Sequence, residues 1–157
     1  PTTWGNNLKL SLDTYVPGLL LWLTNKLASS ATRLYKDRFG IAIADWRVLS
    51  YLVVYPWSTA ASACELMGMD KAAVSRSLSF MMSQGWLKSR PKGLRKVEYA
   101  VSRSGKQLHG RAIKLVLARQ DALLTGLTSS DRKQLLRCLH TMLDNLEIVE
   151  AIESSEA

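Results

Sequence analysis

Apolar and polar residues alternate with the period of a helix over the first quarter of the chain. The apolar residues return every three or four positions, which predicts an amphipathic helix over about residues 10–38. Pro17 and Gly18 are expected to bend its early turns, and Gly40 is expected to end it. The predicted apolar face consists of Leu12, Val16, Leu20, Leu23, Leu27, Ala31 and Leu34.

A second helix is predicted over about residues 43–55, and Pro56 ends it. A pair of closely spaced helices follows. The first runs from Thr59 or Ala60 to Leu66, and the second from about 70 to 84, with Gly68 permitting a tight turn between them. The expected inward residues are Trp46, Leu49, Ser50 and Val53, and then Val74, Leu78 and Met81 or Met82.

The pattern changes after Gly85, which is expected to close the preceding helix in a left-handed conformation. Residues 86–88 and 98–101 resemble two short strands, and the segment RPKGLRK between them forms a loop whose Pro91 and Gly93 suit a turn. Two helices, a turn and a small hairpin in this order predict a winged helix-turn-helix, in which the hairpin is the wing.

Two more amphipathic helices complete the pattern. One is expected from its cap at Ser102 to about Leu124, and the other follows the capping signal at 128–131 and extends to Val149. The tail after Glu150 is expected to fray. The fold class is therefore mainly α with a small β wing, divided into an N-terminal helix (1–40), a winged lobe (41–101) and C-terminal helices (102–157). The flanking helices are more apolar than one copy can bury, which predicts a homodimer.

The positively charged residues are concentrated in and around the winged segment. The chain has a formal net charge of +8, yet residues 70–120 hold twelve Lys and Arg residues against only Asp70 and Glu98. A basic middle between near-neutral ends is the electrostatic pattern of a surface that binds a polyanion. We therefore expect double-stranded DNA as the partner, with the helix that begins at Asp70 in the major groove and the wing along the backbone or the minor groove.

The predicted DNA-binding residues share a polar or small side chain and a place on these elements. Arg76 could pair with a guanine or with a phosphate, and both alternatives stay open. The set comprises Ser58, Thr59, Ser62, Lys71, Ala72, Ser75, Arg76, Ser79, Arg90, Lys92, Arg95 and Lys96.

Other function classes find little support in the residues. His109 and His140 have no neighbouring nucleophile–acid pair, and no metal-ligand spacing or phosphate-binding glycine loop occurs, so we expect no enzyme, metal or cofactor. Cys64 and Cys138 fall on apolar helix faces and are expected to be buried thiols. The apolar run at 16–23 is too short to cross a membrane and lacks the flanks of a secretory signal, so the cytoplasm is the expected location.

Three segments resemble the MarR family of bacterial transcription regulators: GIAIADWRVLSYL at 40–52, ACELMGMDKAAVSRSLSFMMSQGWLKSR at 63–90 and VSRSGKQL at 101–108. The resemblance implies a homodimer joined through its first helix and its last two helices. It also implies a repressor that a small effector, often aromatic or phenolic, releases from a pseudo-palindromic operator.

An aromatic acid or its CoA thioester would suit aromatic walls with one or two cationic groups. For Trp22 and Trp46 the alternative is core packing. The candidate ligand-binding residues are Trp22, Asn25, Ser29, Arg33, Trp46, Arg47, Tyr51, His109 and Arg111.

The sequence departs from the family pattern in two places. Ala42 stands where a polar cap usually opens the second helix, and Asp45 is expected to compensate as an acid in the first turn. Gly93 replaces the aspartate of the Asp-x-Arg element of the wing, so the carboxylate that would orient Arg95 is missing there and a more mobile wing is expected. A redox-sensing regulator of the same fold and a nonspecific architectural DNA-binding protein remain as alternatives.

Overall fold

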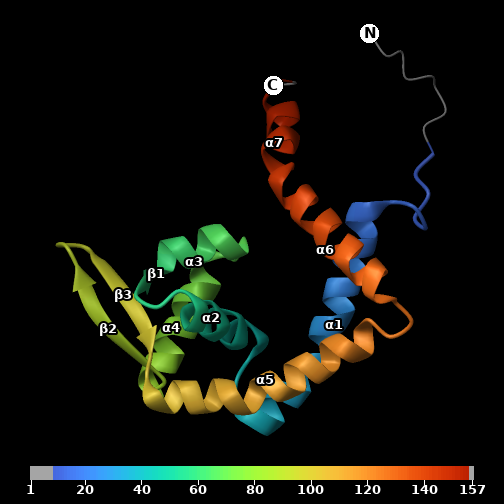
Figure 1. Cartoon of the computed structure of the whole chain (residues 1–157). Coiled ribbons are helices and arrows are strands. Elements are labelled where there is room, and N and C mark those ends of the chain that lie inside the picture. Colours follow the sequence, from blue (N-terminus) through green and yellow to red (C-terminus); the bar gives the residue numbers. More distant parts are fainter. Residues whose placement is uncertain (1–8, 156–157) are drawn as a thin grey trace. The chain divides into compact units, whose positions relative to one another are not determined.

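The computed structural model describes residues 9–155, and Figure 1 labels their elements. The fold is mostly helical with a small antiparallel sheet, as the sequence predicted. The chain divides into two compact units after Ala112, within the fifth helix. In chain order the elements are α1 (Val16–Phe39), α2 (Ile43–Val54), β1 (Ser58–Thr59), α3 (Ala60–Met67), α4 (Lys71–Ser83), β2 (Leu87–Lys92), β3 (Lys96–Val101), α5 (Arg103–Leu123), α6 (Ser129–Asp144) and α7 (Leu146–Ser155).

The first unit is built around the packing of α2 and α3 on α4, with α1 against α2 and the sheet against α2 and α4. Its core is apolar and closely packed, and it includes Val74, Leu78 and Met81 on α4, as predicted. Leu108 and Ala112 of α5 are also buried. The largest fully buried side chains are Ile41, Leu49, Leu52, Met81, Leu108, Val48 and Val74.

Helix ends follow the predicted chemistry. Asp70 caps α4, because its Oδ2 accepts a hydrogen bond of 3.1 Å from the backbone N–H of Ala73. Gly68, with a φ of 62°, allows the chain to turn from α3 into that cap. At the start of α2, the N–H of Ala42 donates to Asp45 Oδ2 at 2.8 Å. The buried carboxylate of Asp45 thus satisfies the N–H of Ala42, while Ala42 itself offers no side-chain cap to the first turn.

The three strands are ordered β1-β3-β2. β2 and β3 form an antiparallel hairpin in which Arg90 lies opposite Glu98 and Lys92 lies opposite Lys96. The strands are longer than predicted, so only residues 93–95 remain as the loop. β1 was not predicted, because a two-residue strand has too few positions to show alternation.

Several predicted boundaries and exposures were wrong. α1 begins at Val16 rather than near residue 10, and Pro17 lies in its first turn, where its missing N–H costs no hydrogen bond. The last predicted helix is two helices, α6 and α7, separated at Asn145, and α7 extends through Ser155 rather than fraying after Glu150. Val53 and Cys138 are exposed, and Cys64 is half-buried.

The second unit contains the end of α5 with α6 and α7. Thr128 and Asp131 cap α6 reciprocally: the N–H of Thr128 donates to Asp131 Oδ2 at 2.8 Å, and the N–H of Asp131 donates to Thr128 Oγ1 at 3.1 Å. The Thr128 hydroxyl also donates to Asp131 Oδ2, at 2.7 Å, and this hydrogen bond together with the one from the Thr128 N–H lowers the pKa of Asp131. No residue of α6 is buried. On its apolar side Leu136 and Leu143 are exposed, while Leu139 and Met142 are half-buried.

Candidate nucleic-acid interface

α4 has a buried face and an exposed face. Val74, Ser77, Leu78 and Met81 are buried. All the residues predicted to contact bases from this helix are exposed, and their spacing places them along one side of it. They are Lys71, Ala72, Ser75, Arg76 and Ser79. A helix that presents a polar, cationic stripe opposite a packed apolar one has the form needed to enter a major groove.

The hydroxyl groups at the start of α3 are engaged within the chain. Thr59 Oγ1 caps α3 by accepting from the N–H of Ser62 at 3.2 Å, and Ser62 Oγ donates to the Thr59 carbonyl at 3.0 Å. Ser58 Oγ donates to the carbonyl of Tyr55 at 2.7 Å. These three predicted residues are held in place. A phosphate would have to replace the hydrogen bonds that the Ser58 and Ser62 hydroxyls donate, whereas Thr59 Oγ1 accepts in its cap.

The wing carries its cations in two groups. In the first group, Arg90 and Lys92 share the carboxylate of Glu98, at 2.8 Å from Arg90 Nη2 and 3.6 Å from Lys92 Nζ. The hydrogen bond from Arg90 is the main reason that the pKa of Glu98 is lowered. The second group, Arg95 and Lys96, has no carboxylate within ion-pair distance among the side chains of residues 9–152.

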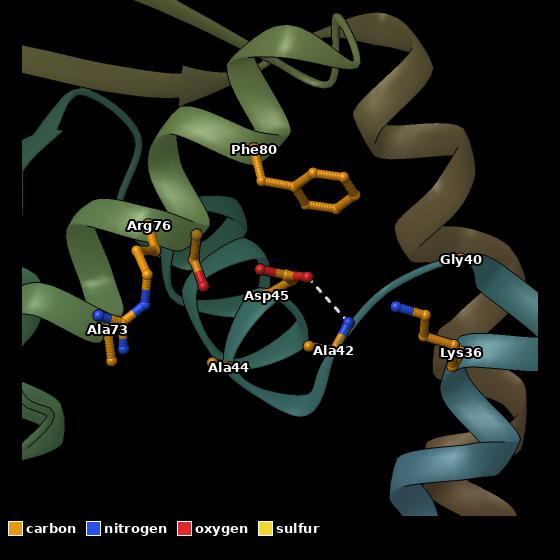
Figure 2. A pocket seen from close by; sticks show the side chains of 9 residues that line it. Lys36, Gly40, Ala42, Ala44, Asp45, Ala73, Arg76 and Phe80 are labelled. Carbon is orange, nitrogen blue, oxygen red and sulfur yellow. Dashed lines mark hydrogen bonds between the residues drawn. The ribbon is translucent and has the colours of Figure 1, made fainter.

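A hollow of about 290 Å³ lies beside α4, between this helix and the connection from α1 to α2 (Figure 2). Arg76 and Phe80 reach it from α4, and Lys36 reaches it from the last turns of α1. Residues with small side chains, among them Ala42, Ala44 and Ala73, form much of the rest of its lining. An occupant would therefore contact Arg76, which also belongs to the exposed stripe of α4. The lining residues are Lys36, Gly40, Ala42, Ala44, Asp45, Ala73, Arg76, Ser77 and Phe80.

None of the predicted ligand-binding residues lines this hollow. Trp46 is half-buried and stacks on the ring of His109, with centroids 4.9 Å apart and planes 11° apart. The rings of Tyr35 and Trp46 pack edge to face, with their centroids 6.4 Å apart. The aromatic wall expected around Trp46 is thus filled by the chain's own rings, and burial lowers the pKa of His109.

The other candidates of that set are less enclosed. Trp22 is 39% exposed, and Tyr51 is half-buried against Tyr55 with ring centroids 5.2 Å apart. Arg33 pairs with Asp37 on the surface at 3.4 Å. The remaining four are exposed: Asn25, Ser29, Arg47 and Arg111.

Two residues of the wing region were missed. A sequence signal for Glu98 exists only once the hairpin register is known, because strands that pair about Leu94 place it opposite Arg90. Trp57 gives no such signal, since its importance comes from its backbone conformation and from a contact with a distant strand. Among the described residues, no group of three or more metal-ligating side chains is close enough to hold an ion, and no described helix is long and apolar enough to cross a bilayer.

The arrangement matches solved structures along almost the whole chain. A MarR/EmrR family regulator from Acinetobacter sp. ADP1 aligns with a TM-score of 0.80 and 22% identity, over 88% of this chain and 99% of that one. The present chain has the fold of MarR-family transcriptional regulators. A mutant MarR from E. coli complexed with operator DNA aligns at 0.71 and 21% identity, over 87% of this chain and 99% of that one.

A third match is the PcaV regulator from Streptomyces coelicolor, in complex with its natural ligand. It aligns at a TM-score of 0.71 and 16% identity, over 88% of this chain and 98% of that one. No family model and no curated protein matches the sequence. The likeness thus rests on the MarR fold, and the function has to be argued from the residues of this chain.

Proposed function

We propose that the protein is a MarR-type transcriptional regulator that binds a pseudo-palindromic operator as a homodimer and represses transcription in the cytoplasm. The observation that carries the proposal is the exposed face of α4, on which all five predicted contact residues lie together. The basic wing extends from the same lobe, and the net positive charge of residues 70–120 is larger than that of the whole chain, because the rest of the chain is slightly acidic. A fold of this kind occurs with operator DNA in the E. coli structure.

The homodimer is supported by apolar surface that the chain leaves uncovered. Within α1, Leu19 to Leu23 are each 38–57% exposed, and they include residues on every side of the helix. Large apolar residues of α6 and α7 are exposed as well, among them Leu143, Leu146, Ile148, Val149 and Ile152. So much apolar area on helices of one chain is typical of a surface that a second copy covers.

The DNA proposal is tested with duplexes that the purified protein enriches from a random library. We expect a discrete footprint with two half-sites about one helical turn apart, and a dimer by light scattering. Uniform protection without enrichment would instead support an architectural DNA-binding protein. A monomer that enriches no duplex at low salt would refute the proposal.

We further propose that a small aromatic or phenolic acid, or its CoA thioester, releases the protein from its operator. Support comes from the surroundings of Trp46. One turn along α2, the buried hydroxyl of Ser50 has no hydrogen-bond partner among the described residues, and a buried polar group of this kind needs a partner. A ligand that displaces His109 from Trp46 would gain an aromatic stack and reach this face of α2.

A thermal-shift screen with benzoic and phenolic acids and their CoA esters tests the effector. An active compound should raise the melting temperature and release DNA, and Trp46→Leu should abolish both effects. If Phe80→Ala abolishes them instead, the ligand occupies the hollow beside α4. Release by peroxide with oxidation of the exposed Cys138 would favour the redox-sensing alternative.

A further inference from the structure

Trp57 adopts a backbone conformation that a tryptophan seldom takes. Its φ is 59°, and it is the one residue other than glycine with a left-handed φ in the described range 9–155. Glycine would adopt this conformation without steric cost. The indole is half-buried, and it lines a hollow of about 170 Å³ that has both apolar residues and the cations Lys88 and Lys106 in its wall.

The indole lies against the cations of β2. The guanidinium carbon of Arg90 is 4.1 Å from the ring centroid, and Lys88 Nζ is 5.5 Å from it. At these distances a cation is attracted to the face of the ring, and a planar guanidinium can also stack on it. The backbone strain at Trp57 thus coincides with a specific contact to the wing.

Glu98 holds the same guanidinium from β3. Its Oε2 accepts hydrogen bonds from Arg90 Nε at 3.1 Å and from Nη2 at 2.8 Å. The two residues lie opposite each other across the hairpin, and Thr59 of β1 pairs with Glu98 on its other side. Two segments, Trp57 beside β1 and Glu98 on β3, therefore hold a single arginine.

The fixed arginine still has capacity for another partner. The Arg90 side chain is 52% exposed, whereas that of Glu98 is only 11% exposed. Nε and Nη2 face the carboxylate, which leaves the N–H groups of Nη1 for a phosphate. Lys92 pairs with the same carboxylate, so this cluster keeps a net positive charge.

We infer that Trp57 is a positioning residue which, together with Glu98, orients Arg90 as the fixed phosphate contact of the wing. This inference rests on the proposed function. Arg95 and Lys96 have no carboxylate to orient them within the described side chains, so they add general attraction to the DNA. An arginine that is already ordered loses less side-chain entropy on binding, which makes Arg90 the stronger contact.

The first test is a double-mutant cycle of Trp57→Gly and Arg90→Ala, measured by fluorescence anisotropy on a duplex that the wild-type protein enriches. Trp57→Gly should weaken binding about three- to fivefold, the size of a cation–π contact at a partly exposed site. It should leave the melting temperature unchanged or raised, because glycine relieves the strained φ. Arg90→Ala should reduce the slope of log affinity against log salt by about one.

The double variant should bind no more weakly than Arg90→Ala alone, and Trp57→Phe should bind within about twofold of wild type because it keeps a ring under the guanidinium. If the loss of affinity in the double variant equals the product of the two single losses, Trp57 acts on DNA independently of Arg90, and the inference is overturned. A Trp57→Phe protein as weak as Trp57→Gly would do the same.

Glu98→Gln supplies a second test that does not depend on the folding of the Trp57 variants. Removal of a negative charge should strengthen DNA binding if charge alone matters. We expect a loss of affinity instead, because Arg90 is no longer oriented, and the loss should vanish in an Arg90→Ala background. A gain in affinity refutes the inference. Failure of the wild-type protein to enrich any duplex would refute the proposed function as well. If the wild-type protein does enrich a duplex but the effects of Trp57→Gly and Arg90→Ala are additive, only the role of Trp57 is refuted.

Discussion

Gly105 marks the point where α5 meets the base of the wing, and its replacement by alanine should be strongly destabilising. An added Cβ would lie 2.1 Å from the carbonyl oxygen of Trp86 and 2.7 Å from Cγ1 of Val101. The first turn of α5 would have to move by about 1 Å to restore contact distance. The residue before that turn, Ser102, is bonded to the segment between α4 and β2: its N–H donates to Trp86 O (2.9 Å) and its Oγ donates to Gly85 O (2.6 Å).

The size of the effect follows from these contacts. Two weakened hydrogen bonds cost about 1 kcal/mol each, and overpacking adds about 1–2 kcal/mol. We therefore expect Gly105→Ala to lower the free energy of unfolding by about 3–4 kcal/mol, or the melting temperature by roughly 6–16 °C in calorimetry.

Gly110→Ala is the matched control for Gly105→Ala. It lies in the same helix, and a Cβ there meets no atom within 4 Å. Alanine has the higher helix propensity, so the free energy of unfolding of this variant should be higher than that of the wild-type protein by about 0.5–1 kcal/mol. A Gly105→Ala protein as stable as Gly110→Ala would show that α5 does not pack on Trp86 in this way.

Three further predictions concern DNA binding and pH. Arg76→Ala should cost about 1–3 kcal/mol on the enriched duplex and much less on random duplex if Arg76 contacts a base, and equal losses in titrations of both would assign it to phosphate. Arg95→Ala should weaken all sequences alike and reduce the salt slope by about one, so an unchanged slope would exclude contact of the wing tip with the backbone. Because burial lowers the pKa of His109 below its ordinary value of 6.5, the unfolded chain binds a proton first as pH falls below that value. The free energy of unfolding should then decrease until the pH passes the pKa of the folded state. Melting temperatures measured from pH 7.5 to 5.5 should therefore fall less for His109→Phe than for the wild-type protein.

The elements of the lobe were predictable because local signals and packing agree there. Asp70 caps α4 and Gly68 turns the chain, as their side chains and conformational freedom suggest. The inward residues Val74 and Leu78 have the spacing of a packed helix face, and both are buried. The exposed stripe of α4 then follows from the same period, since a helix that buries one side must show the other.

The wing shows where such reasoning stops. The carboxylate that orients an arginine was expected to be lost with Gly93, yet Glu98 supplies one to Arg90 across the hairpin. The strand register determines this pairing, and the register depends on the exact length of the turn. The contribution of Trp57 was beyond prediction, because a left-handed φ at a large residue opposes its own preference and is imposed by the tertiary structure.

Hydrophobic periodicity also leaves open which molecule covers an apolar face. α4 and α6 both have apolar residues at helical spacing, but α4 buries four residues within the chain and α6 buries none. The difference lies in neighbours: α4 is packed by α2 and α3, whereas α6 makes its main contacts with α7. Exposed Leu136 and Leu143 would therefore remain in water in a monomer, at a cost of roughly 1.5–3 kcal/mol for each side chain that could be fully buried. A second copy with the same uncovered helices offers a matching apolar surface, so the pattern that predicts α6 as a helix becomes, with the fold known, an argument for self-association.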